Sequence, residues 1–197
     1  MTPSQVASGN GPQGLLFDPR FLEIYAGERI LKLPRTAIIE LVANAWDAGA
    51  TRVTIGWPDD ELGGGFSIED DGEGMTKEQF EHRWRTLAYN RLREQGLTVS
   101  VSGGTRQTPR TVFGRNGIGR FAGFCFGNEY CVETWRDGQT EVYRVLRGHD
   151  RPLQLVHVRS SSKGGHGTRL FVDDPRAVRL TAEEARAEIG MRFLTDP

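Results

Sequence analysis

Four short stretches of the sequence hold side chains whose types and spacing could do chemistry. In the first, ELVANAWDAGA, Glu40, Asn44 and Asp47 fall within about 60° of one another on a helix. A carboxylate on such a face can polarise a water molecule, and an amide oxygen one turn later can ligate a hard cation. An ordinary solvent-exposed face of an amphipathic helix has the same pattern, so this stretch alone leaves both interpretations open.

The second stretch is EDDGEGMT, in which an apolar, strand-like segment ends in acidic residues and glycines. Asp70, at the strand end, could accept a hydrogen bond from an amino group, while Gly72 and Gly74 let the backbone approach a flat ligand closely. Asp and Gly also favour tight turns, so a solvated acidic turn is the simpler interpretation of this stretch alone.

The other two stretches are rich in glycine. In GRNGIGRFAGF, Gly114, Gly117 and Gly119 precede an expected helix, whose free backbone N–H groups could cradle phosphates. In GGHGTRLFV, Thr168 opens a strand after a glycine loop. Two common nucleotide motifs do not explain the pattern. The segment from Gly117 matches GxGxxA without a clear strand leading into it, and GxxxxGK[ST] is absent.

The elements that must position these residues mix strands and helices without regular alternation, which favours an α+β sandwich. One helix is expected over residues 34–48, ended by Gly49, and Thr76 can cap a second over residues 77–90. Residues 91–117 lose periodicity and read as a long functional loop. Strands are expected at residues 52–57 and 65–70, in a hairpin turning at Asp137-Gly138, in PLQLVHVRS and in GTRLFV, and a Thr181–Glu184 capping box opens a last helix.

The composition is typical of one soluble globular domain: 197 residues, 37% apolar and 26% charged. No apolar run has the length of a membrane span, and a net charge of −1 gives no basic field that would indicate nucleic acid binding. Residues 1–17 are predicted to be a flexible leader rather than a signal peptide. Cys125 and Cys131 fit neither a metal site nor a redox pair, so we expect buried thiols in a reducing cytoplasm.

In this order and spacing, the four stretches together resemble the motifs of the GHKL ATPases, which include gyrase B subunits, ninety-kilodalton heat-shock chaperones, histidine kinases and MutL. ELVANAWDAGATRVTI is similar to the N box, IEDDGEGM to the DxGxG box, GRNGIGRFAGF to the GxxGxG box and GTRLF to the final Thr-bearing box. The resemblance covers residues 24–172. It implies a Bergerat-type fold, a two-layer α/β sandwich with a mixed β-sheet and helices on one face, over residues 18–197, with a lid at about residues 90–116.

The resemblance also implies roles for single residues in binding ATP and Mg²⁺. Glu40 would be the general base that orients the attacking water, and Asn44 would ligate the magnesium. Asp70 would accept a hydrogen bond from the adenine amine, steadied by Thr168. The lid would bring arginines over the phosphates, namely Arg91, Arg93, Arg106, Arg110 and Arg115. The other residues implied at the nucleotide are Asp47, Gly72, Gly74, Met75, Gly114, Gly117, Ile118, Gly119 and Arg120.

The N box is most similar to those of MutL, gyrase and MORC-type ATPases, in which ATP closes the lid and drives dimerisation. This implies hydrolysis of ATP to ADP, slow in the isolated domain, within a longer chain that carries further domains and can form an ATP-dependent homodimer. A phosphotransferase of the histidine kinase or anti-sigma kinase type is the alternative, although every histidine follows Glu40. A module that senses ATP without turnover is a third possibility, against which Glu40 argues. Neither a membrane nor nucleic acid is indicated as a direct partner.

Overall fold

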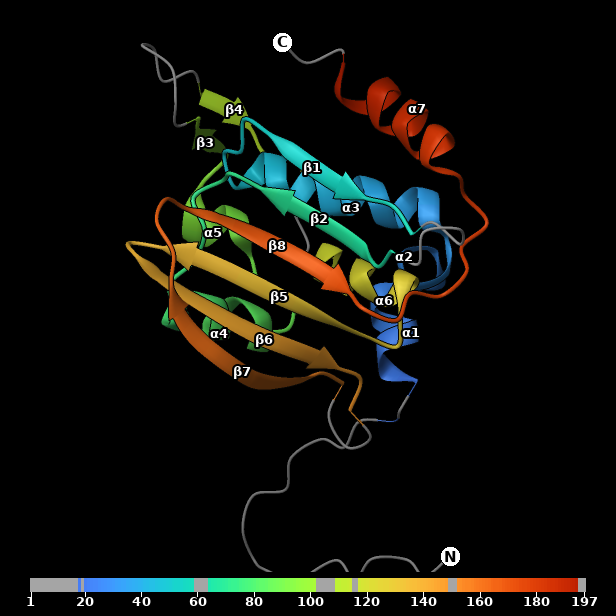
Figure 1. Ribbon diagram of the computed structural model, residues 1–197, viewed down its shortest axis with the longest axis horizontal. Coiled ribbons are helices and arrows are strands. Elements are labelled where there is room, and N and C mark those ends of the chain that lie inside the picture. The colour runs from blue at the N-terminus through green and yellow to red at the C-terminus, as the bar shows by residue number, and fades with distance from the viewer. Residues whose placement is uncertain are drawn as a thin grey trace, which may run out of the picture.

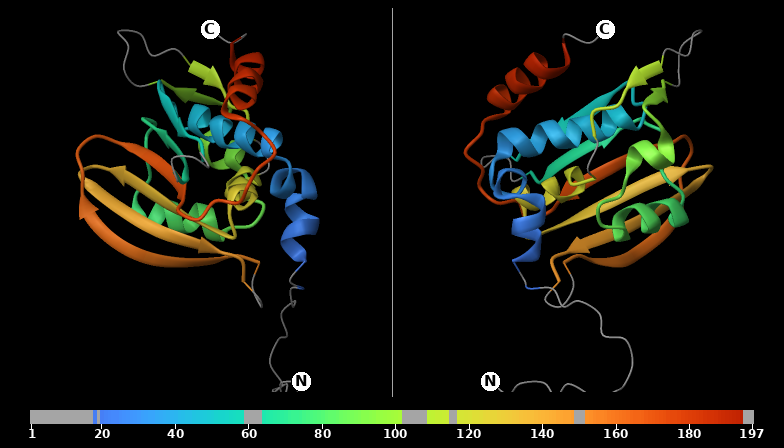
Figure 2. Two further views of the ribbon diagram at one scale, coloured as in Figure 1. Left: turned by 45° about the vertical axis from the view of Figure 1, so that its right-hand side comes forward. Right: turned by 180° about the vertical axis from the view of Figure 1, so that it is seen from behind.

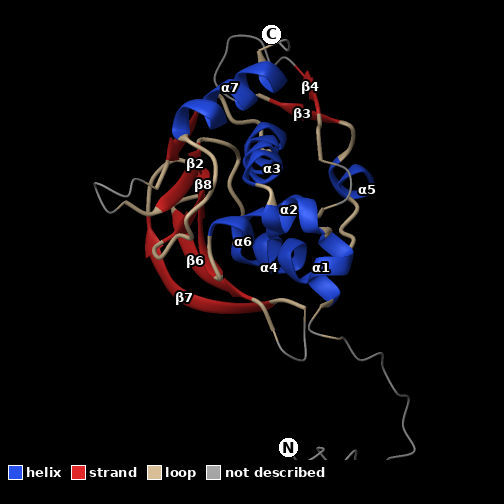
Figure 3. Cartoon of the chain, turned by 90° about the vertical axis from the view of Figure 1, so that its right-hand side faces the viewer, coloured by secondary structure: helices blue, strands red, loops and turns tan. Residues whose placement is uncertain are grey.

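The fold is a six-stranded β-sheet covered on one face by helices, and the four stretches lie partly on the sheet and partly on the helices (Figures 1 and 3). The residues that the computed structural model describes are 18, 20–58, 64–101, 109–114, 117–148 and 152–194. The predicted flexible leader, residues 1–17, lies outside them. The strands follow one another across the sheet in the order β1 (Val53–Gly56), β2 (Phe66–Asp70), β8 (Gly167–Val172), β5 (Glu129–Arg136), β6 (Gln139–Leu146) and β7 (Gln154–Ser162).

The sheet register brings the second and fourth stretches together. Asp70, at the end of β2, pairs with Thr168 on β8, and Thr168 pairs in turn with Thr134 on β5. The α+β sandwich of the Bergerat type is therefore confirmed. In one respect the structure differs from the expectation of a mixed sheet. All the strand pairings in this sheet are antiparallel, because the chain reverses direction between each pair of neighbouring strands.

Helix α3 (Pro34–Asp47) occupies the middle of the helical layer and holds the first stretch. Its proline stands at the first helical positions, where a fixed φ suits the helix and the missing N–H is not needed. Ile38 and Leu41 are buried in the core, while Asn44 on the opposite side is exposed. The neighbouring helices are α1 (Phe21–Ala26), α2 (Glu28–Lys32), α4 (Lys77–Arg85), the 3₁₀ turn η1 (Gly119–Ala122) and α6 (Gly123–Phe126). Seen from behind in Figure 2, they lie in front of the sheet.

Most of the expected elements are confirmed, with one helix shorter than expected. The Asp137-Gly138 turn joins β5 to β6 with φ angles of 53° and 79°, the left-handed pair that a two-residue hairpin requires. Helix α7 (Ala182–Phe193) begins with the predicted capping box. Thr76 also forms a capping box, but α4 ends at Arg85 rather than near residue 90, because Thr86 is extended and Ala88 has a φ of 52°.

The expectation of an irregular loop over residues 91–117 is partly wrong. Its described part contains helix α5 (Arg91–Gln95) and a small two-stranded sheet of β3 (Thr98–Ser100) and β4 (Pro109–Thr111). Arg106 and Arg115 lie outside the described residues. Cys125 is buried as expected, whereas Cys131 is only partly buried, and both are free thiols.

In the part of the chain that the structure describes, every helix is too short or too polar to cross a membrane.

Candidate functional site

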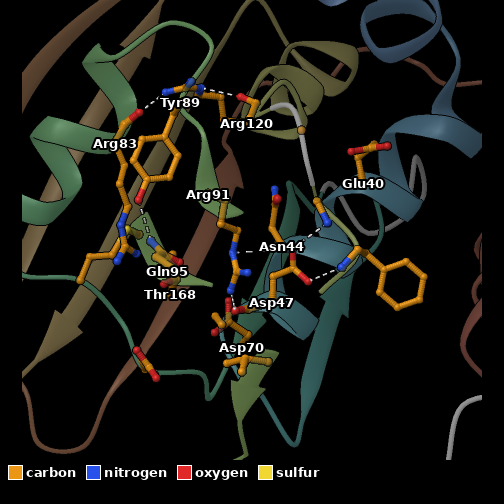
Figure 4. Close-up of a pocket in the computed structure, with 18 of the residues that line it drawn as sticks. Glu40, Asn44, Asp47, Asp70, Arg83, Tyr89, Arg91, Gln95, Arg120 and Thr168 are labelled. Atoms are coloured by element: carbon orange, nitrogen blue, oxygen red, sulfur yellow. Dashed lines mark hydrogen bonds and ion pairs between the residues drawn. The ribbon is translucent and has the colours of Figure 1, made fainter. Parts of the chain in front are cut away.

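Residues from all four stretches line one cavity of about 610 Å³ (Figure 4). The residues that the resemblance implies at the nucleotide lie on its wall, except Gly72, whose amide donates to Asp70. Of the lid arginines that the structure describes, Arg91 lines the cavity, whereas Arg93 and Arg110 do not. The volume is within the range of about 300–1,000 Å³ that small-molecule sites occupy. The fold therefore converts four separate stretches of sequence into one concave site.

At one end of the cavity, α3 meets the glycine-rich loop. A Cβ atom added to Gly119 would lie 3.0 Å from Oε2 of Glu40 and 3.1 Å from Oδ1 of Asn44. Burial raises the pKa of Glu40, the nearby Asp47 raises it further, and Arg192 opposes both. A carboxylate with a raised pKa is a better proton acceptor, as a general base requires.

At the other end lies Asp70, a carboxylate that forms no ion pair with the described residues. Its Oδ1 accepts a hydrogen bond from the Gly72 amide at 2.8 Å. Burial raises the pKa of Asp70 to about 6, the amides of Gly72 and Thr168 oppose this shift, and the neighbouring Asp71 adds to it. A partly buried carboxylate with a raised pKa is typical of a functional site, where a ligand donor can complete its hydrogen bonding.

The neighbouring Asp71 has a different, structural role. Its carboxylate accepts hydrogen bonds from the amide and hydroxyl of Thr51, at 2.7 and 2.6 Å, and from the amide of Arg52 at 2.8 Å. These bonds tie the turn to the start of β1 and lower the pKa of Asp71 against the effect of burial. Asp71 therefore has the structural role that an acidic turn implies, and a contact between Asp70 and a nucleotide stays a prediction.

The glycines of the second stretch are required by packing. A Cβ atom on Gly72 would lie 2.7 Å from Cβ of Ala48 on α3. Gly74 has a φ of 63°, and its Cβ would lie 2.1 Å from the carbonyl oxygen of Trp135. Gly74 and the buried Met75 also line the cavity. Their contact with an adenine ring, implied by the resemblance, stays a prediction.

Thr134 is a positioning residue that the sequence did not reveal. It is fully buried on β5, and its hydroxyl accepts a hydrogen bond from the Met75 amide at 2.8 Å. Only the sheet register, which places Thr134 beside Thr168 and two strands away from Asp70, could have identified it.

Asp47 binds the segment that is predicted to form the lid. Its carboxylate accepts hydrogen bonds from the backbone amides of Phe113 and Gly114, both at 2.8 Å. The guanidinium of Arg91, on α5, donates to the carbonyl oxygen of Asp47 (Figure 4). Burial raises the pKa of Asp47, and the two amides and Arg91 lower it. Arg91, Phe113 and Gly114, from two parts of this segment, are thus attached to the last turn of α3.

Arg120 shapes the glycine-rich loop rather than presenting a free charge. It is buried, and its guanidinium donates to the backbone carbonyls of Gly117, Thr86 and Arg83. Gly117 has a φ of 63°, which favours glycine, while its neighbour Ile118 is half-buried against the core. The loop that carries the implied phosphate contacts is therefore fixed by the chain itself.

Several further residues that the sequence analysis did not identify line the cavity, some of them from the end of α4 and from residues 89–113. Tyr89, for example, is buried and accepts a hydrogen bond from Gln95 at 2.8 Å. The others are Ala48, Glu73, Arg83, Trp84, Thr98, Val99, Ser100 and Phe113.

Gly119→Val is expected to weaken the binding of ADP and ATP by about 10-fold or more and to leave adenosine binding nearly unchanged. The new side chain would displace the ends of Glu40 and Asn44 and block the approach of phosphate to the loop. Calorimetry with the three ligands tests this. Gly64→Val, at an exposed glycine with nothing within 4 Å, is the matched control. An equal loss for all three ligands would show that Gly119 is structural.

Asp70→Asn is expected to raise the free energy of unfolding at pH 7 by about 1–2 kcal/mol. Because folding raises the pKa of Asp70 from 3.8 to about 6, its contribution to stability is full below about pH 4 and is lost as pH rises through 6. Urea unfolding at pH 7 and at pH 4 measures the difference, which should disappear at the lower pH. A variant less stable than the wild type at pH 7 would contradict the assignment.

The antiparallel sheet, the helix with its acid and amide, and the glycine-rich loop that meets them define the site of a Bergerat-fold protein of the GHKL class. The comparison with protein families agrees. The chain belongs to the family of histidine kinase-, DNA gyrase B- and HSP90-like ATPases, whose model matches residues 32–162.

Curated relatives share parts of the chain. It is 33% identical over 110 residues, 56% of its length, to HgiDII of Herpetosiphon aurantiacus, which carries the name of a type II restriction enzyme. It is 29% identical over 144 residues, 72% of its length, to the DNA mismatch repair protein MutL of Ehrlichia chaffeensis. The MutL of Dictyoglomus turgidum is 46% identical over 73 residues, 36% of the chain. These alignments span 16%, 20% and 11% of the three relatives' own lengths.

Proposed function

We propose that this domain binds ATP with Mg²⁺ and hydrolyses it to ADP and phosphate. The observation that carries the proposal is the proximity of Glu40 and Asn44 to Gly119 at one end of the cavity, while the partly buried Asp70 lies at the other. Membership of the ATPase family supports ATP binding. The hydrolysis, the metal and the residue roles are the finer parts of the proposal.

The orientation of the nucleotide follows from α3. Glu40, Asn44 and Asp47 succeed one another over about 10 Å of the helix axis, at 1.5 Å per residue. The Asp70 turn packs on Ala48, just beyond the end of that helix, where the Glu73 amide donates to the Ala48 carbonyl at 2.8 Å. Adenine would therefore lie at Asp70, and the phosphates would extend along α3 toward Glu40 and Gly119.

Asn44 is the residue that would hold the magnesium. Its side chain is exposed, and its Oδ1 lies beside Gly119, where the phosphates are proposed to bind. Among the described residues, no group of three or more His, Cys, Asp or Glu side chains could hold a metal alone. This fits Mg²⁺, which commonly uses one or two protein oxygens and takes its remaining ligands from phosphates and water. The ion would neutralise charge on the phosphates.

Glu40 would accept the proton of the attacking water as its oxygen forms a bond to the terminal phosphorus and the bond to the bridging oxygen breaks. Its half-buried position and raised pKa suit this task. The loop from Gly117 to Gly119 would offer backbone amides to the phosphates, and no covalent intermediate with the protein is needed.

We further propose that ATP binding acts as a conformational or dimerisation switch in a longer cytoplasmic protein. The similarity to MutL supports this role, because these relatives extend far beyond the region shared with this chain. The lid segment attached to Asp47 and the reduced cysteines are consistent with it.

A turnover assay with radiolabelled ATP tests the proposed reaction. Release of free phosphate, dependent on Mg²⁺, is expected. Transfer of the label to a protein substrate would instead support a phosphotransferase, and binding without either product would indicate a nucleotide sensor.

A further inference from the structure

The last turn of α7 contacts the same lid residue that Asp47 holds in the cavity wall. The ring of Phe193 lies 5.1 Å from that of Phe113 and 5.9 Å from that of Trp46 on α3, measured between centroids. The guanidinium of Arg192 lies 5.4 Å from the Phe113 ring. Phe113 therefore has its backbone bound inside the nucleotide site and its side chain bound outside it, on α7.

The segment around Phe113, residues 109–114, is here called the lid base. Besides Asp47, three contacts fix it to the end of α3 and the residues just after it. The indole N–H of Trp46 donates to the carbonyl of Thr111 at 3.1 Å, and the guanidinium of Arg110 lies 4.3 Å from the Trp46 ring while donating to the Ala50 carbonyl. Gly114, the last residue of the lid base, lines the cavity.

Helix α7 is itself fastened at its other end. Arg35, in the first turn of α3, forms ion pairs with Glu184 and Glu188 on α7. Figures 1 and 3 show the resulting arrangement, with α7 lying beside α3. A helix held at both ends and packed on the lid base can transmit a displacement between the two, because packed side chains do not deform continuously.

We propose that Phe193 is a positioning residue for the phosphate end of the nucleotide site and that nucleotide binding and the last turn of α7 are coupled through Phe113. Phe193 acts on the lid base, the lid base acts on Gly114 and the glycine-rich loop, and the loop contacts the phosphates. The coupling is reciprocal, so a nucleotide that orders the loop also steadies the end of α7. The charge of Arg192 also acts on the site at longer range, because it opposes the raised pKa of Glu40. The nucleotide part of the inference rests on the proposed function.

Two exposed residues on the same turn supply matched controls. Met191 is 71% exposed and Leu194 is 84% exposed, so trimming either to alanine removes apolar surface without touching the lid base. Phe193→Tyr keeps the ring and should behave like the wild type, whereas Phe193→Ala removes the contact. Circular dichroism and urea unfolding establish that each variant is folded.

The first measurement needs no nucleotide. Hydrogen exchange of the Phe113 and Gly114 amides should accelerate in Phe193→Ala and stay unchanged in Phe193→Tyr and Leu194→Ala. Equal exchange rates in all variants would overturn the link between α7 and the lid base, whether or not the protein binds ATP.

The second measurement is calorimetry with ADP and with adenosine. Phe193→Ala should weaken ADP binding by about 2- to 30-fold and leave adenosine binding unchanged, because adenosine has no phosphate. In the wild type, ADP should slow hydrogen exchange in residues 190–194. If Phe193→Ala binds ADP as tightly as Leu194→Ala does, the coupling is refuted. Failure of the wild type to bind any adenine nucleotide would instead refute the proposed function. The hydrogen-exchange measurement would still test the link between α7 and the lid base.

Discussion

Replacing Glu40 with alanine is expected to lower ATP turnover by about 10²–10⁴-fold, the usual effect of losing a general base, while ATP affinity stays within a few-fold. The reason lies in the position of the carboxylate. It lies beside Gly119, at the end of the cavity where the phosphates are proposed to bind, and has a pKa raised by burial, so we expect it to act on water rather than to bind adenine. Phosphate release and calorimetry measure the two effects separately.

Glu40→Gln provides a second variant of the same shape that lacks the base, and its turnover should fall similarly. Glu28→Ala is the control, because Glu28 is exposed on α2 and pairs only with Lys32 among the described residues. If either Glu40 variant turns ATP over at the wild-type rate, Glu40 is not the general base.

Asp70→Asn is expected to weaken ATP binding by about 10- to 150-fold, which corresponds to the loss of one hydrogen bond to a charged group. The substitution keeps the size of the side chain but removes its charge and introduces an amide donor. The preference for ATP over GTP should also decrease, because an Asn amide can face either purine edge. Calorimetry with both nucleotides measures these changes.

The stability of the same variant separates binding from folding. Because the charged Asp70 destabilises the fold at pH 7, Asp70→Asn should bind ATP more weakly although it is more stable. Asp71→Asn should instead lower the stability and leave ATP affinity nearly unchanged. The reason is that Asp71 accepts three hydrogen bonds from Thr51 and Arg52, which hold the turn. Equal ATP affinity in Asp70→Asn and the wild type would refute the adenine assignment.

The fold and the position of the site were largely predictable because their signals are local. A proline at the start of α3, a capping box at Thr76 and another at Thr181 fix helix starts, and Asp137-Gly138 fixes a hairpin. The order of the four stretches then identified residues that the structure gathers in one cavity.

What the sequence could not predict depends on contacts between residues far apart in the chain. The two amides bound by Asp47 come from the lid base, more than sixty residues later. The carbonyls bound by Arg120 come from the end of α4, at Arg83 and Thr86. Thr134 has no motif around it, and it became part of the site only through the sheet register. Such roles follow from tertiary packing, on which local residue patterns carry no information.

Titration of the wild-type domain with ATP, followed by calorimetry in the presence of Mg²⁺, is the most direct test of the proposed site. We predict that one ATP binds per chain, more tightly than either GTP, which lacks the adenine amine, or adenosine, which lacks the phosphates. No detectable binding of ATP at millimolar concentration, or equal affinity for ATP and GTP, would contradict the proposal that Asp70 and the glycine-rich loop form the two ends of a nucleotide site.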